Sequence, residues 1–289
     1  MRSPIRWFGG KGNLINKLIS IIPPHHTYVE VFGGGASLLF AKKPSPVEVY
    51  NDINSDLVNF FRVLRSPKAY KRLQRLAALT PYSREEYDLC RSRLNYNLEE
   101  VIRAYRFFIV ARMSMSGKFG HGVSWSVTET YGGMACSVKQ YLSAIDNLER
   151  THKRLMCVQV ENQDFRTLIH RYDTFNTFFY LDPPYAHSTR KGGGYSYELQ
   201  DSDHKDLVTL LLSIKSKAVL SCYWHDVYQP LIDAGWTRED HKTSCYAAGR
   251  LKVVGLQGKG SATKMQPRTE TVLLSPNCLT GWGLKPISL

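Results

Sequence analysis

Two hydrophobic patterns alternate along the chain, one typical of buried strands and one typical of amphipathic helices. The clearest strand is Thr177–Leu181, whose largely apolar residues without polar alternation indicate burial on both faces, as in a parallel sheet. The prolines that follow end it, because proline cannot donate to a strand ladder. Other strands are expected at 27–31, 47–50, 155–160, 218–223, 236–247 and 271–274. Helices are expected at 13–22, 38–41, 138–154, 202–212 and 226–234.

The order of these elements predicts an α/β protein with one interruption. Strands and helices alternate near both ends of the chain, whereas helical periodicity dominates between residues 56 and 154, where basic side chains also concentrate. We therefore predict a discontinuous Rossmann-like domain of residues 1–55 and 155–289, interrupted by a mainly helical domain of residues 56–154.

The strand at 177–181 runs directly into Asp182, Pro183, Pro184 and Tyr185. This tetrapeptide falls at the carboxyl edge of a strand, where ligands bind in open α/β sheets. A carboxylate and a backbone carbonyl can accept both hydrogens of a nucleobase amino group and so aim its lone pair at an incoming methyl group, while an aromatic ring stacks on the base. The alternative is a rigid proline turn with a tyrosine facing solvent.

A glycine loop follows the strand at 27–31. Strand, Gly33–Gly35 and helix form the first half of a Rossmann-like unit. The spacing differs from G-x-G-x-x-G, which argues against a dinucleotide and leaves room for a smaller adenosyl ligand. Asp52 follows the next strand, about 20 residues farther on, where a carboxylate can bind ribose hydroxyls. Its alternative role is to cap the helix near Asp56.

Three further segments are candidates for the same site. Asp164 also ends a strand, so it either reaches a ligand or caps the following helix. The glycine turn that contains Trp7 and Lys11 precedes a helix, which suits an anion or close backbone approach, although it is also an ordinary flexible turn. The glycine-rich stretch 186–199 is either a mobile lid or a linker.

The charge balance favours a polyanionic partner. Lysine and arginine number 38 against 25 acidic residues, a formal charge of +13, which suits nucleic acid or a membrane surface. No apolar run approaches the roughly 20 residues that span a bilayer, and the N-terminus lacks a signal-peptide core, so we expect a soluble cytoplasmic protein. The 6 cysteines and 9 histidines are scattered without ligand spacing, which predicts neither a metal site nor a disulfide framework.

Two loops are candidate nucleic-acid surfaces. The loop at 112–127 combines glycines, hydroxyls and aromatics that can contact base edges or insert as wedges, and the stretch 249–268 is basic and glycine-rich. The alternatives are solvated helix faces, sequence-independent phosphate contacts and a charged hairpin loop. The candidate DNA contacts are Arg112, Ser114, Ser116, Lys118, His121, Ser124, Trp125, Lys191, Arg250 and Lys252.

With these motifs in this order, the chain resembles the Dam-like DNA adenine methyltransferases over nearly its whole length. The segment from Arg6 to Lys11 is similar to the family's N-terminal motif, residues 29–35 to its glycine motif, and Asp182–Tyr185 to its catalytic tetrapeptide. Ala36 stands where many members have a third glycine, and the loop at 114–125 is only loosely similar, which leaves the target sequence open.

The resemblance implies a Rossmann-like sheet that binds S-adenosylmethionine, with the helical insert as the target-recognition domain. It implies methylation of the N6 amino group of an adenine flipped out of double-stranded DNA, without a metal, by a bacterial or phage-encoded monomer or homodimer that in some systems has a cognate restriction endonuclease as partner. The implied catalytic residues are Asp182, Pro183, Pro184 and Tyr185. The implied cofactor contacts are Trp7, Lys11, Glu30, Phe32, Gly33, Gly34, Gly35, Asp52, Asp164, Phe165 and Asp182.

Two alternatives remain open. One is methylation of the exocyclic N4 amine of cytosine, which poses the same lone-pair problem. The other is a DNA-binding regulator with a vestigial cofactor pocket, whose expected mark is a broken tetrapeptide or a lost Asp52, and neither is present in the sequence.

Overall fold

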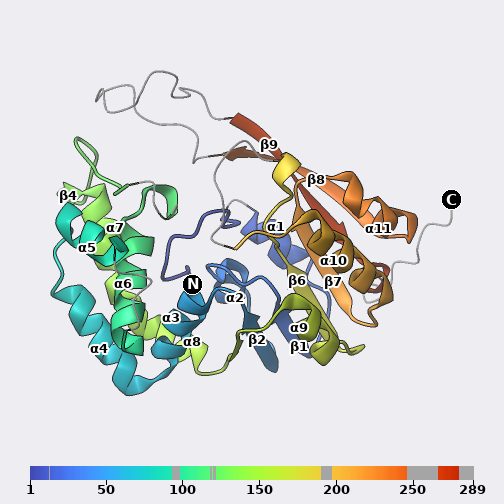
Figure 1. Ribbon diagram of the computed structural model, residues 1–289, viewed down its shortest axis with the longest axis horizontal. Coiled ribbons are helices and arrows are strands. Elements are labelled where there is room, and N and C mark those ends of the chain that lie inside the picture. Colours follow the sequence, from blue (N-terminus) through green and yellow to red (C-terminus); the bar gives the residue numbers. More distant parts are fainter. Residues whose placement is uncertain are drawn as a thin grey trace.

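The chain forms a seven-stranded sheet with helices on both faces (Figure 1). The computed structural model describes residues 1–12, 14–92, 98–117, 119, 122–189, 197–245 and 266–279. The strands lie in the order β5-β2-β1-β6-β7-β9-β8. Their bounds are β1 Thr27–Glu30, β2 Val47–Asn51, β5 Gln159–Glu161, β6 Thr177–Leu181, β7 Lys217–Cys222, β8 Thr237–Cys245 and β9 Gln266–Leu274.

Five neighbouring strands are parallel, and the last two close the sheet as an antiparallel pair. Strands β5, β2, β1, β6 and β7 run in one direction, whereas β9 is antiparallel to both β7 and β8. From β1 the chain continues to β2 on one side, and from β6 to β7 on the other, so the winding reverses between β1 and β6. This arrangement confirms the expected Rossmann-like sheet, and ligands bind at such a reversal.

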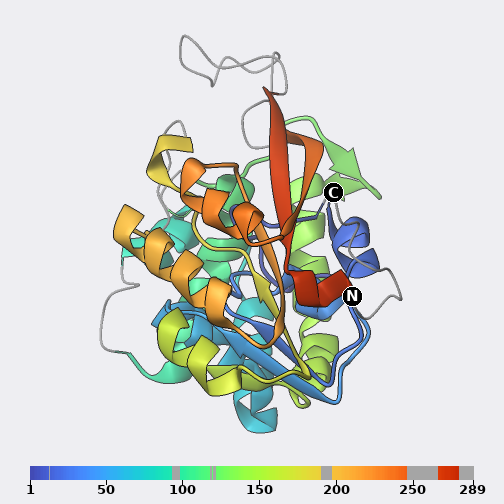
Figure 2. The same ribbon diagram turned by 90° about the vertical axis from the view of Figure 1, so that its right-hand side faces the viewer.

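Successive residues of the central strands face opposite layers, as the two-residue period of a strand requires. In β6, Phe178 and Tyr180 belong to one buried apolar cluster, and Phe179 and Leu181 to the other. Figure 2 shows the helices on opposite sides of the strands. One face packs against α1 Ile15–Ser20, α2 Ser37–Ala41 and α3 Ser55–Arg65, and the other against α9 Phe165–Tyr172, α10 Asp201–Ser213 and α11 Gln229–Asp233.

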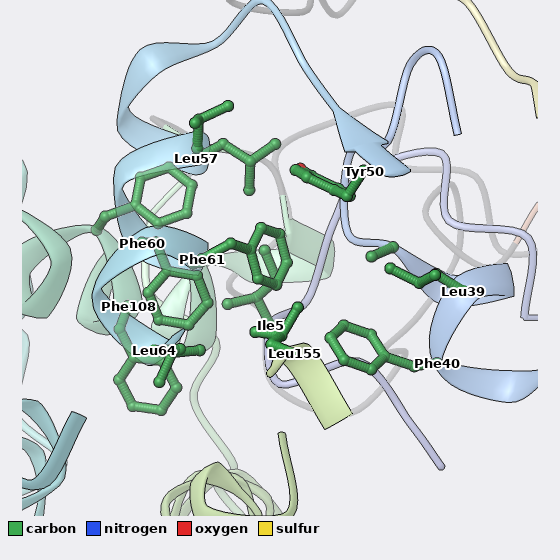
Figure 3. Packing of buried hydrophobic residues seen from close by; sticks show 14 of the residues in the cluster. Ile5, Leu39, Phe40, Tyr50, Leu57, Phe60, Phe61, Leu64, Phe108 and Leu155 are labelled. Carbon is green, nitrogen blue, oxygen red and sulfur yellow. The ribbon is translucent and has the colours of Figure 1, made fainter. Parts of the chain in front are cut away.

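Between β2 and β5 the described chain is mainly helical, and these helices gather on one side of Figure 1. Phe61 of α3 lies between Tyr50 of β2 and Phe40 of α2 (Figure 3), so one apolar cluster joins this segment to the sheet. The division into a catalytic and a recognition domain therefore stays a prediction. After α3 the segment contains α4 Pro67–Ala78, α5 Arg84–Ser92, α6 Glu100–Met113, β3 Thr130–Tyr131, β4 Met134–Ala135, α7 Cys136–Asp146 and α8 Leu148–Leu155.

The structure differs from the expected elements around residue 150. The helix expected at 138–154 is two helices, α7 and α8, which meet at Asn147. The strand expected from residue 155 begins only at Gln159, because Leu155 is the fully buried last residue of α8. A short apolar run fits a buried strand and a buried helix end equally well. The remaining elements are the 3₁₀ turns η1 Met115–Gly117, η2 His187–Thr189 and η3 Asp226–Tyr228, and α12 Pro276–Leu279.

Candidate active site

A cavity of about 540 Å³ opens at the carboxyl ends of β1, β2 and β6, where the winding of the sheet reverses. The structure brings all eleven predicted cofactor contacts to its wall, from five separate segments of the sequence. They are Trp7, Lys11, Glu30, Phe32, Gly33, Gly34, Gly35, Asp52, Asp164, Phe165 and Asp182.

The glycine loop can pass beneath the cavity only because it lacks side chains. A Cβ on Gly33 would lie 2.2 Å from the Tyr50 ring, and one on Gly34 would lie 2.7 Å from the Trp7 indole nitrogen. Gly34 has a φ of +47°, which favours glycine. Ala36 also has a positive φ, 54°, at the position where a third glycine is common in the family that the sequence resembles.

We expect Gly33→Ala to lower the free energy of unfolding by about 3 kcal/mol, since its methyl would also lie 2.8 Å from the Asn51 carbonyl oxygen, which cannot move away as a flexible side chain does. Chemical denaturation of the purified variant measures this loss. Gly12→Ala is the matched control, because its Cβ would meet nothing within 4 Å. Equal stability of the two variants would contradict the steric account.

Asp52 holds the glycine loop and the next helix in place. Its Oδ2 accepts from the Gly34 backbone N–H at 2.9 Å, and its Oδ1 accepts from the Asn54 N–H at 2.8 Å. The N-cap of α3 is Asn54, whose side chain accepts from the N–H groups of Asp56 and Leu57. The cap role that was the alternative for Asp52 therefore belongs to Asn54, which leaves the Asp52 carboxylate on the cavity wall.

Asp164 caps a helix and also lies on the cavity wall, so its contact with a ligand stays a prediction. Its Oδ1 accepts from the Arg166 backbone N–H at 2.9 Å and so caps α9, while the residue also lines the cavity. The Arg166 guanidinium also binds Asp203 and Asp206 of α10, at 2.6 and 2.7 Å. These ion pairs fix α9 and α10 together beside the cavity.

Three carboxyl groups line the cavity, and burial disfavours their charged forms. Burial raises the pKa of Glu30 to about 7 and that of Asp182 to about 6, and burial also raises the pKa of Asp52. Glu30 Oε1 accepts from the Tyr28 hydroxyl and the Leu39 N–H, both at 2.7 Å. Its buried Oε2 has no hydrogen-bond donor among the described residues. A site with this electrostatic character fits a cationic ligand.

The N-terminal glycine turn and the tetrapeptide Asp182–Tyr185 meet beside the cavity. The buried Lys11 ammonium lies 2.9 Å from Asp182 Oδ1 and 3.6 Å from Glu270 Oε2 of β9, and it also contacts the Tyr185 hydroxyl. Lys11 was expected to contact the cofactor. The structure places it on the cavity wall and beside the Asp182 carboxylate.

The four residues of the tetrapeptide are not equally accessible. Asp182 and Pro184 line the cavity, whereas Pro183 is buried and lies off the lining. The Tyr185 side chain is 4% exposed, its ring lies 4.4 Å from the Tyr223 ring, and its hydroxyl donates to Glu270 at 2.6 Å. The ring is therefore packed away from the cavity wall in this structure, and its stacking on a target base stays a prediction.

The predicted DNA contacts have different surroundings. Ser114 is fully buried, and its hydroxyl lies 3.2 Å from that of Tyr87, so the expected base contact by Ser114 is not supported. Arg112 donates to the Gln140 carbonyl at 2.5 Å. Burial and then the nearby Arg6 charge lower its pKa to about 10.

Two other residues of the loop at 112–127 are more exposed than Ser114. Trp125 is 41% exposed with the Arg84 guanidinium 4.4 Å above its ring, and the half-buried Ser124 accepts from the Tyr82 hydroxyl through its carbonyl. For Ser116 the structure describes the backbone alone, in η1. Lys118, His121, Lys191, Arg250 and Lys252 lie outside the described residues.

The structure also shows site residues that the sequence analysis missed. Asn51 joins the ends of three strands, since its Nδ2 donates to the carbonyls of Val31 and Gln163 and its Oδ1 accepts from the Gln163 N–H. Its place beside Asp52 was the one available signal. No motif marked Glu270, or the cavity residues Gln200 and Asp203. Tyr197, Glu198 and Leu199, which belong to the stretch predicted as a lid or linker, also line the cavity.

Two negative findings apply to the described residues alone. Within these ranges no helix is long and apolar enough to cross a bilayer. No group of three or more His, Cys, Asp or Glu side chains in the same ranges is arranged to hold a metal ion, and the expected absence of a metal stays a prediction.

A parallel sheet of this order, with a glycine loop after β1, an acid after β2 and Asp-Pro-Pro-Tyr after β6, defines the Rossmann-like methyltransferase class. The chain belongs to the D12 class N6 adenine-specific DNA methyltransferase family, whose sequence profile matches residues 7–238. This match confirms the resemblance to the Dam-like DNA adenine methyltransferases that the sequence motifs indicated.

Named relatives agree with this family at low identity. The chain is 23% identical to the modification methylase StsI of Streptococcus sanguinis over 65% of this chain and 29% of that protein. It is 25% identical to the type II methyltransferase M1.LlaDCHI of Lactococcus lactis over 73% of this chain and 75% of that protein. A DNA adenine methylase of Vibrio cholerae is 28% identical over 40% of this chain and 42% of its own length.

Proposed function

We propose that the protein is a site-specific DNA methyltransferase that transfers a methyl group from S-adenosylmethionine to the N6 amino group of adenine in double-stranded DNA. The observation that carries this proposal is the position of Asp182. Its carboxylate ends β6 at the reversal of the sheet, on the same cavity wall as the glycine loop and Asp52.

The cavity fits S-adenosylmethionine. The cofactor carries an ammonium and a sulfonium, and three carboxylates, those of Glu30, Asp52 and Asp182, line the wall. The unpartnered Glu30 Oε2 supplies an acceptor that such a cation would satisfy. When bound, the cofactor supplies a methyl group already activated by the sulfonium, so the protein needs only to align donor and acceptor. Asp52 would accept from the ribose hydroxyls, and Trp7 and Phe165 would pack against the ligand.

Asp182 and the Pro183 carbonyl would orient the acceptor. Each accepts one hydrogen of the flipped adenine's amino group, so that the nitrogen lone pair points at the methyl group. Lys11 now lies 2.9 Å from Asp182 Oδ1, and it would have to leave that oxygen when the amine binds. In the same proposal Tyr185 stacks on the base once its loop has moved.

The partners follow from charge and from the family. The excess of 38 basic over 25 acidic residues favours DNA, and the exposed Trp125 with its neighbour Arg84 supports a recognition surface on the helical segment. A cognate restriction endonuclease, a monomeric or homodimeric state and a cytoplasmic location belong to this proposal as well.

Mass spectrometry of nucleosides from DNA treated with the protein and S-adenosylmethionine tests the proposal directly. We expect N6-methyladenine, because the family profile is adenine-specific. N4-methylcytosine would instead support the cytosine alternative. Absence of both, with no cofactor binding by calorimetry, would support the DNA-binding regulator. Sequencing methylated host DNA would add the target sequence.

A further inference from the structure

Glu270 lies at the centre of a charged cluster that also contains Lys11, Asp182 and Tyr185. Its side chain, 12% exposed, comes from β9, outside the region that the family profile matches. The Tyr185 hydroxyl donates to Glu270 Oε2 at 2.6 Å, and the Lys11 ammonium lies 3.6 Å from the same oxygen. Nothing in the proposed chemistry uses this carboxylate.

The Glu270 contact gives the Tyr185 ring one orientation. A hydrogen bond from a hydroxyl to a carboxylate is charge-assisted and therefore among the stronger ones. The ring is fixed at its hydroxyl by Glu270, and the Tyr223 ring packs beside it at 4.4 Å. Any movement of the ring toward the cavity would break its hydrogen bond to Glu270 and its packing on Tyr223.

Glu270 also changes how Lys11 interacts with Asp182. A buried ammonium needs nearby negative charge, and Asp182 alone would have to supply it if Glu270 were neutral. The Lys11 ammonium would then be held more tightly on the oxygen that the target amine needs. With Glu270 charged, the ammonium has a second carboxylate, at 3.6 Å compared with 2.9 Å to Asp182.

We propose that Glu270 is a positioning residue of the methyl-transfer site: it holds the Tyr185 hydroxyl while no base is bound, and it shares the Lys11 ammonium with Asp182, so that Asp182 can accept a hydrogen from the target amine. This inference rests on the proposed function.

Replacing Glu270 by glutamine tests this role, since the amide keeps the size and removes the charge. We expect the single-turnover rate of methyl transfer to fall about 10- to 100-fold, the range that a small misplacement of reacting groups produces, with KM for DNA near wild type. The matched control is Glu239→Gln on β8 of the same hairpin, whose carboxylate pairs with Lys17 at 2.9 Å and is 32% exposed. A wild-type rate for Glu270→Gln would overturn the proposal.

The pH profile separates positioning from a merely structural effect. In the wild type we expect kcat/KM to fall below about pH 6, where Asp182 takes up a proton. The Glu270 charge is one cause that raises the pKa of Asp182, so Glu270→Gln should move this acid limb to lower pH. If Glu270→Gln is slower but the acid limb of its pH profile lies at the wild-type pH, the proposal is wrong. The titratable groups that act on Asp182 besides Glu270 are Lys11, Glu30, Tyr180, Tyr185, Cys222 and Tyr228.

Tyr185→Phe provides a second variant that removes the hydroxyl and keeps the ring. We expect the double variant with Glu270→Gln to be no slower than the slower single variant, because both break the same contact. If Glu270→Gln does not fold, the rate of Tyr185→Phe alone tests whether the Tyr185–Glu270 hydrogen bond affects methyl transfer. A wild-type rate for Tyr185→Phe would overturn the proposal.

The same two single variants and their double variant can also be compared by their free energies of unfolding. This double-mutant cycle tests the Tyr185–Glu270 contact independently of activity. Non-additive losses are expected, and additive losses would overturn the contact. A wild type that transfers no methyl group to DNA would refute the proposed function, and this result is seen before any variant is made.

Discussion

Asp182→Asn is expected to lower the single-turnover rate of methyl transfer by about 10²- to 10³-fold at saturating cofactor and DNA. A group that stabilises charge developing in the transition state contributes roughly this much to rate. The asparagine keeps one acceptor oxygen, but its NH₂ would face the hydrogens of the target amine, and the negative charge near the developing cation is lost. Lys11 would also lose the carboxylate that now lies 2.9 Å away.

Rapid-quench assays with radiolabelled cofactor measure this rate, and calorimetry on the same sample measures cofactor binding. Asp233→Asn is the control, because that side chain is exposed, bonds only to Gln229 at 2.8 Å among the described contacts, and does not line the cavity. A near wild-type rate for Asp182→Asn, with normal cofactor binding, would show that the tetrapeptide is not the catalytic motif.

Asp52→Ala is expected to raise the dissociation constant for S-adenosylmethionine about 100-fold. Two hydrogen bonds from ribose hydroxyls to a carboxylate are worth about 1.5–3 kcal/mol each, and tenfold in affinity corresponds to about 1.4 kcal/mol. The change also removes the acceptor of the Gly34 and Asn54 N–H groups, so the glycine loop loses its link to the turn before α3.

Isothermal calorimetry measures this affinity, and Asp56→Ala is its matched control. Asp56 lies four positions later, pairs with Arg103 at 3.1 Å and does not line the cavity. We expect the control to bind cofactor as wild type does. Equal losses in the two variants would point to a general effect on this region, and no loss for Asp52→Ala would remove the ribose assignment.

Much of the fold could be predicted, because the hydrophobic pattern indicates where strands and helices lie along the chain. Thr177–Leu181 could be predicted as a central strand because all five residues are apolar or small enough to be buried on both faces, and all five are buried. The strand predicted at 236–247 is β8, Thr237–Cys245, whereas the strand predicted at 271–274 is β9, which begins five residues earlier, at Gln266. The division of the helical region was less predictable, since the break between α7 and α8 lies at Asn147, which has no glycine or proline beside it.

In the candidate site, too, some residues could be predicted from the sequence and others could not. The residues that line the cavity after β1, β2 and β6 could be predicted, because glycines and acids directly after strands are local signals. Ser114 could not, because a serine in a polar loop gives no sign that it will be buried against Tyr87. Glu270 could not either, since its role depends on β9 lying beside β7 in the finished sheet.

By itself, the sequence determined which residues end strands, and therefore which side chains gather at the carboxyl edge of the sheet. Asp52, Asp164 and Asp182 were placed by this rule, because the direction of a parallel strand fixes where its following residue lies. Only the tertiary structure decided which charges share one cavity wall and which rings remain accessible. Lys11, Tyr185 and Glu270 come from segments that no local pattern relates, and their contacts follow from the packing of the whole chain around β6.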